Sequence, residues 1–149
     1  MQPFPHHYRV DASVGPEGDA PLTSDGVEAI ASAPPKEFGG PGNRWSPEAL
    51  LTAALADCLI LNFRGIAGFS RFKWISLRAR TVGTVDRIEG KMRFTRFDTD
   101  VELLLPPGAD AERAKQLLHK AESTCPISNS LSCQGHLAIT IQFASSDSA

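Results

Sequence analysis

The sequence has little that points to nucleic acid, a membrane or secretion. Its 149 residues carry a formal net charge of −2 and contain no long basic run, which argues against nucleic acid as a partner. The longest apolar run, Ala49–Phe63, contains Asp57 and Asn62 and is shorter than the roughly 20 residues that a membrane-spanning helix needs. The first residues, MQPFPHHYRVD, lack the charged and then apolar order of a signal peptide. We therefore expect a cytoplasmic protein without a membrane segment.

Motifs for metal, nucleotide and serine chemistry are also missing. The three cysteines form no CxxC pair, which argues against a zinc ribbon and against a disulfide scaffold. The four histidines are scattered and none lies in an HExxH pattern, so we expect no metal. No GxSxG, GxGxxG or GxxxxGK motif is present, which leaves serine hydrolysis and nucleotide binding without support. We expect no organic cofactor either.

The composition is that of an ordinary globular protein, with 42% hydrophobic and 21% charged residues. This length and composition predict a single domain over residues 1–149. Alternating and three-to-four-residue apolar patterns predict the order strand, strand, strand, helix, strand, strand, helix, strand. The fold class is therefore α+β, with a mostly antiparallel sheet and a long central helix.

The expected helices have clear starts. Ser46 is a good N-cap before Pro47, and the helix should run to about Ala67. This helix is apolar nearly all round, which predicts a buried, central position. Asp110 should cap the second helix, whose apolar face carries the following residues: Ala114, Leu117, Leu118, Ala121 and Cys125.

The cysteines themselves leave the question of chemistry open. Cys58 lies in an apolar helix, where a cysteine is more often a packing residue than a nucleophile. Cys125 directly precedes Pro126, which should break the helix and can begin a new one. A thiol at a helix start has a lowered pKa, but a cysteine that merely ends an apolar stripe is an equal alternative. Cys133 lies in a loop and is interpreted as a bystander.

Glu48 is too far along the first helix to serve the cysteine of the same chain. Ten residues separate Glu48 from Cys58, which corresponds to about 15 Å along an unbroken helix. If the two share a site, either the helix bends or Glu48 comes from a second subunit.

Two segments, each with a cysteine in its own motif, resemble the OsmC/Ohr family of thiol peroxidases. These are GNRWSPEALLTAALADCL and AESTCPISNSL, which place the cysteines 67 residues apart. SDGVEA and PKEFGG occur in the family order as well, so the resemblance covers nearly the whole chain.

This resemblance implies an intertwined homodimer with its active sites at the subunit interface. Cys58 matches the peroxidatic cysteine, Cys125 matches the resolving cysteine, and Glu48 from the partner subunit belongs to the charge network around the thiolate. The implied reaction reduces a hydroperoxide through a sulfenic acid and then a disulfide. A dithiol, such as a lipoylated protein, would reopen that disulfide. The apolar neighbours Leu55, Leu59 and Phe63 would favour organic hydroperoxides.

The chain departs from the Ohr branch at one point. That branch has an arginine in the N-terminal turn, whereas the corresponding turn here, VGPEGDAP, has none. Arg44 is the candidate replacement, and Lys36 and Arg9 are weaker ones. Two alternatives therefore stay open beside the peroxidase: a dimer that binds a small apolar ligand with idle thiols, and a redox sensor that uses the same disulfide as a switch.

Overall fold

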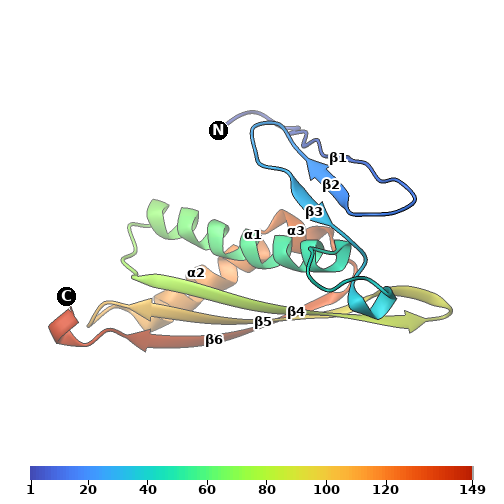
Figure 1. The fold of residues 1–149 in the computed structure, drawn as a ribbon. Coiled ribbons are helices and arrows are strands. Elements are labelled where there is room, and N and C mark those ends of the chain that lie inside the picture. Colours follow the sequence, from blue (N-terminus) through green and yellow to red (C-terminus); the bar gives the residue numbers. More distant parts are fainter. Residues whose placement is uncertain (149) are drawn as a thin grey trace. The chain divides into compact units, whose positions relative to one another are not determined.

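The computed structural model describes residues 1–148 and divides the chain into two compact units, of which the second begins at Leu51 (Figure 1). The elements follow in the predicted order, and the short helix that Pro126 was expected to begin is present as α3 before the last strand. The single domain that the sequence predicts stays a prediction.

The first unit contains a small antiparallel sheet in the order β1-β2-β3. β1 spans Asp11–Ala12, β2 spans Ala20–Thr23 and β3 spans Ile30–Ser32, followed by the short 3-10 helix η1 at Lys36–Phe38. The mild alternation of HHYRVDASV predicts a longer first strand, over residues 6–14. Only Leu22 and Thr23 of β2 pair with β1. β1 ends after Ala12, because the next residue of β2 in the register is Pro21, which has no N–H to donate.

The long helix α1 spans Pro47–Phe69 and begins as the sequence predicts. The backbone N–H of Ala49 donates to the hydroxyl of Ser46 at 3.1 Å, which confirms the N-cap. The helix continues two residues beyond the expected end near Ala67. Its 23 residues form one continuous helix, so Glu48 lies about 15 Å along the axis from Cys58 of its own chain.

The second unit contains a three-stranded sheet in the order β4-β5-β6. β4 (Ser76–Ile88) and β5 (Lys91–Leu105) form the long hairpin that the sequence predicts. Glu89 and Gly90 close it with φ of 50° and 78°, as a two-residue turn of this kind requires. β6 (Gln134–Phe143) lies parallel to β5, because the helices between them carry the chain back across the sheet.

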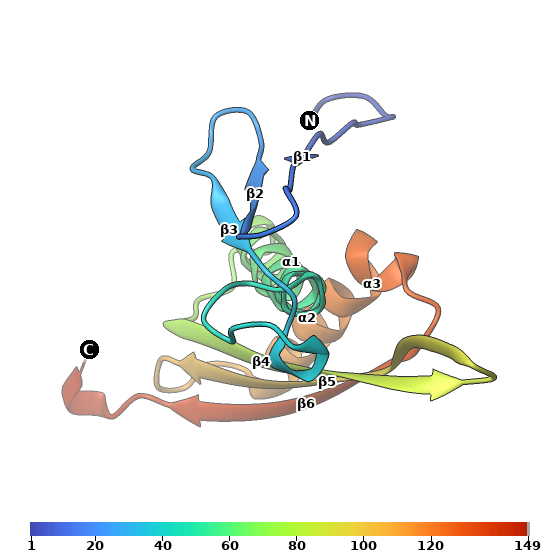
Figure 2. The ribbon, with the colours of Figure 1, turned by 45° about the vertical axis from the view of Figure 1, so that its right-hand side comes forward.

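Both α1 and α2 (Ala111–Ser123) lie on the same side of this sheet, as the two views show (Figures 1 and 2). The backbone N–H of Arg113 donates to the carboxylate of Asp110 at 3.0 Å, which confirms the predicted cap of α2. The core of the second unit joins the buried stripe of α1, the inner face of β5 and the apolar face of α2. Its buried residues are Leu59, Phe63, Ala67, Val101, Leu103, Leu105, Ala114, Leu117, Leu118 and Ala121.

The expectation that α1 is buried on all sides was wrong for the single chain. Only Leu59, Phe63 and Ala67 are buried, whereas Leu61 is 45% exposed. The expectation that this segment is too short for a membrane also needs correction, because apolar residues continue past Phe63. By length and composition alone, α1 could cross a membrane. Core helices of soluble proteins meet the same two criteria. The buried stripe of α1 packs on the core of the second unit.

Candidate functional site

The fold brings Cys58 and Cys125 into direct contact. The Cys125 thiol donates to the sulfur of Cys58 with an Sγ–Sγ distance of 2.7 Å. Both cysteines are free thiols. A disulfide bond is about 2.05 Å long, so the two sulfurs need to move by less than an ångström to bond. The two motifs that the sequence singled out therefore meet at one place.

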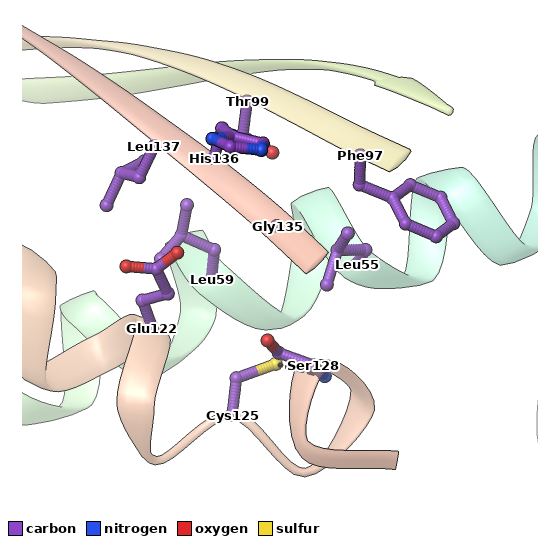
Figure 3. A pocket seen from close by; sticks show the side chains of 10 residues that line it. All are labelled: Leu55, Leu59, Phe97, Thr99, Glu122, Cys125, Ser128, Gly135, His136 and Leu137. Atoms are coloured by element: carbon purple, nitrogen blue, oxygen red, sulfur yellow. Dashed lines mark hydrogen bonds between the residues drawn. The ribbon is translucent and has the colours of Figure 1, made fainter. Parts of the chain in front are cut away.

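The break after α2 places Cys125. Its backbone is extended, with φ −73° and ψ 116°, as expected for a residue before proline. The short helix α3 (Pro126–Ser130) starts directly after it, with Cys125 as the N-cap. The backbone N–H of Ser128 donates to the Cys125 sulfur at 3.3 Å, the contact marked by a dashed line in Figure 3. The side chain of Cys125 is buried and held from both sides of the break.

The surroundings keep the Cys58 thiol protonated. Burial raises the pKa of Cys58 from 9.0 to about 11. The charge of Asp57 acts in the same direction, because it disfavours negative charge on the sulfur. The backbone N–H of Ile127 donates to Cys58 and lowers its pKa in part. A reactive thiolate at neutral pH therefore needs a further positive charge.

A small, mainly apolar cleft opens beside Cys125 within the second unit (Figure 3). α1 contributes Leu55 and Leu59, as the sequence predicts. Phe63, the third apolar neighbour expected there, does not line the cleft, because it packs in the core against Trp74 with the ring centres 5.4 Å apart. The cleft residues are Leu55, Leu59, Phe97, Thr99, Glu122, Cys125, Ser128, Gly135, His136 and Leu137.

Phe97 lines the cleft next to a β-bulge between β4 and β5. The register of β4 and β5 shifts so that Thr84 faces Arg96 whereas Val85 faces Phe94, which leaves Thr95 as the extra residue. Phe94 and Phe97 consequently stack on one another, with ring centres 4.8 Å apart. Gly83 makes room for them, since a Cβ there would lie 2.8 Å from each ring.

Sequence reasoning missed several residues around the thiols. Glu122 lies on α2, three residues before Cys125, and lines the cleft. In the helix that the sequence predicts up to Cys125, this spacing places both residues on one face and could have found Glu122. Its carboxylate also lies 3.8 Å from His119. Thr99 and His136 enter the cleft through the pairing of β5 with β6, for which the sequence gives no signal.

The charged residues expected at the site lie in the first unit. Arg44 forms an ion pair with Asp19 at 2.7 Å, and its side chain is 41% exposed. Lys36 and Arg9 belong to the same unit, as does Glu48, one of whose carboxylate oxygens is buried. A role for any of these residues at the thiols stays a prediction.

The described part of the chain, residues 1–148, contains no group of three His, Cys, Asp or Glu side chains that could hold a metal ion. Cys133 is half-buried in the loop before β6, and its role is untested.

The sequence profile of the OsmC-like proteins matches residues 40–142. The chain belongs to this family. An organic hydroperoxide resistance protein of Xanthomonas axonopodis pv. citri is 30% identical over 137 residues, which cover 89% of this chain and 90% of that protein. The uncharacterised protein YmaD of Bacillus subtilis is 26% identical over 141 residues, covering 92% and 93% of the two chains.

Solved structures share the fold of this OsmC-like protein. An OsmC-like protein of unknown function from Vibrio cholerae superposes with a TM-score of 0.83 at 18% identity, over 91% of this chain and 99% of that one. An organic hydroperoxide resistance protein from Legionella pneumophila gives a TM-score of 0.71 at 22% identity, over 92% and 97% of the chains. The predicted α+β, OsmC-like fold is thereby confirmed.

Proposed function

We propose that this protein is a thiol-dependent peroxidase that reduces organic hydroperoxides to alcohols. The observation that carries the proposal is the 2.7 Å contact between the sulfurs of Cys58 and Cys125. The organic hydroperoxide resistance protein of Xanthomonas, at 30% identity, supports the same class of reaction.

Cys58 performs the first step. Its thiolate attacks the terminal oxygen of the hydroperoxide, the O–O bond breaks, and the alkoxide leaves and takes up a proton as the alcohol. Cys58 is thereby oxidised to a sulfenic acid. The apolar cleft residues Leu55 and Leu59 would bury the alkyl group of the substrate, which favours organic hydroperoxides over hydrogen peroxide.

Cys125 performs the second step. Its sulfur attacks the sulfur of the Cys58 sulfenic acid, a disulfide forms, and the oxygen leaves as water with the proton of Cys125. A dithiol, such as a lipoylated protein, then reduces the disulfide by two thiol exchanges and restores both thiols. The cycle uses neither a metal nor an organic cofactor.

We further propose that the working form is a cytoplasmic homodimer. The exposed apolar surface of α1 is the kind of surface that a subunit interface covers. Since Glu48 lies about 15 Å from Cys58 along the same continuous helix, the glutamate at each thiol would come from the partner subunit. Arg44 precedes the same helix start, so one subunit would supply both charges.

The test measures consumption of cumene hydroperoxide with a dithiol reductant. The wild-type protein should consume the hydroperoxide catalytically, and Cys58→Ser should not. Cys133→Ser is the matched control, because it removes a cysteine outside the contact pair, and it should retain activity. Equal consumption by Cys58→Ser and the wild type would refute the proposal.

One observation favours a second function, in which the dimer binds a small apolar ligand or senses redox state without efficient turnover. The pKa of Cys58 is raised to about 11, which leaves little thiolate at neutral pH. A Cys58 pKa near 11 in the intact protein, with no disulfide after peroxide treatment, would support ligand binding. Slow turnover with a large conformational change on oxidation would support a sensor.

A further inference from the structure

Asn62 is the polar side chain that follows Cys58 by one helical turn on α1. Four residues of an α-helix correspond to about 6 Å of rise, so both side chains point toward the same neighbours. The Asn62 amide donates to the backbone oxygen of Ala121 at 2.7 Å and to the hydroxyl of Thr124 at 2.8 Å. Both acceptors lie at the end of α2, and Thr124 is the residue directly before Cys125.

The first of these hydrogen bonds supplies a partner for a carbonyl at the end of α2. The last carbonyls of a helix have no partner within it. The Lys120 oxygen accepts from the backbone N–H of Thr124, and the Glu122 oxygen accepts from that of Cys125. The Ala121 oxygen between them accepts from Asn62 instead. Asn62 is therefore part of the structure that ends α2 immediately before the thiol.

The chain around Cys125 is consequently anchored to α1 before the thiol and to α3 after it. On the first side, Asn62 binds Thr124. On the other side, the N–H of Ser128 donates to Cys125. Successive turns of α1 thus carry the Cys58 thiol and Asn62, whose hydrogen bonds hold the chain directly before Cys125.

We propose that Asn62 is a positioning residue that keeps Cys125 within bonding reach of Cys58 and thereby sets the rate of disulfide formation. The inference rests on the proposed function in treating that disulfide as a step of the cycle. In this step the S–H of Cys125 and the S–OH of Cys58 give an S–S bond and one water. Asn62 acts through its hydrogen bonds to Ala121 and Thr124.

The experiment separates the two chemical steps in Asn62→Leu and Thr124→Val. The protein is mixed with one equivalent of cumene hydroperoxide, and rapid quenching with a sulfenic acid trap is followed by mass spectrometry. Sulfenic acid formation should stay within about twofold of wild type, whereas disulfide formation should slow by about 10- to 100-fold, as expected when a reacting group is misplaced by about an ångström. Thr124→Ser, which keeps the hydroxyl, should restore the rate. Ser123→Ala is the matched control, since its hydroxyl donates to the backbone oxygen of Lys120 within α2.

A second readout does not depend on peroxide. The thiol pair is equilibrated with a dithiothreitol redox buffer, and the fraction of Cys58–Cys125 disulfide is measured. Asn62→Leu and Thr124→Val should lower the equilibrium constant for the disulfide by about tenfold or more, because the thiols are less well placed. If both variants match the wild type in this constant and in the disulfide rate, the inference is wrong. If wild-type Cys58 is not oxidised by peroxide, the proposed function fails, while the redox buffer still decides the role of Asn62.

Discussion

Cys58 on α1 and Cys125 at the start of α3 contact each other through their sulfurs, 2.7 Å apart, although 67 residues separate them in the sequence. Neither element holds the pair by itself. α1 supplies one thiol, and the break between α2 and α3 supplies the other. The contact is available before any substrate binds, so a sulfenic acid on Cys58 would form next to the thiol that resolves it.

Replacing Cys125 with serine should separate the oxidation of Cys58 by hydroperoxide from the reduction that restores its thiol. In Cys125→Ser the first equivalent of hydroperoxide should still oxidise Cys58, because that thiol is intact. The sulfenic acid should then persist, since no neighbouring thiol can displace its oxygen. Intact-protein mass spectrometry should show a gain of one oxygen atom, and turnover with a dithiol should fall. Formation of a disulfide in this variant would mean that Cys133 resolves Cys58.

The pH dependence of the alkylation rate of Cys58 tests whether a positive charge stabilises its thiolate. A thiol whose pKa is about 11 is mostly protonated at neutral pH, and its reaction rate rises by about tenfold per pH unit below the pKa as thiolate forms. If Arg44 of a partner subunit pairs with the thiolate, the pKa falls and the alkylation rate of Cys58 should level off below pH 11. Arg44→Ala should move the profile to higher pH. Asp19→Asn should move it to lower pH, because it releases Arg44 from its ion pair.

The control for this profile is Arg113→Ala, which removes an exposed arginine from α2. It should leave the alkylation profile unchanged. Profiles that coincide for the wild type, Arg44→Ala and Asp19→Asn would show that Arg44 does not stabilise the thiolate.

Mixed dimers test where Glu48 acts. Glu48→Gln and Cys58→Ser should each be inactive as homodimers. When the two variants are unfolded and refolded together, a mixed dimer contains one intact Cys58 opposite an intact Glu48 of the other chain. Peroxidase activity should therefore reappear in the mixture. A mixture that remains as inactive as its components would place Glu48 in the site of its own chain, or outside the site.

Gly83→Ala should destabilise the second unit and disturb the cleft. A Cβ at this position would lie 2.8 Å from the rings of Phe94 and Phe97 and 2.9 Å from the hydroxyl of Thr52. Such overpacking costs about 1–3 kcal/mol of unfolding free energy, measurable by urea denaturation. Gly135→Ala is the matched strand control, with nothing within 4 Å of its Cβ, and should change stability by about 0.5 kcal/mol or less. Equal stability of the two variants would contradict the close packing.

Features set by neighbouring residues could be predicted from the sequence. Ser46 and Asp110 cap their helices as expected, because a cap depends on residues within one turn. The inner face of β5, with Phe97 and Val101, and the apolar face of α2, with Leu118, are buried as their periodicities indicate.

Features set by distant contacts could not be predicted. The bulge at Thr95 and the parallel pairing of β6 depend on which strands meet, and no local pattern encodes that choice. The hydrogen-bond partners of Asn62 could not be predicted either, because Ala121 and Thr124 lie at the end of another helix.

The most direct test of the account is the product of a single oxidation. The reduced protein is treated with one equivalent of cumene hydroperoxide, without any reductant, and is analysed by intact mass and peptide mapping together with the released alcohol. The account predicts one equivalent of cumyl alcohol and a protein that has lost two hydrogen atoms through a Cys58–Cys125 disulfide. Unconsumed hydroperoxide and two free thiols at Cys58 and Cys125 would contradict it.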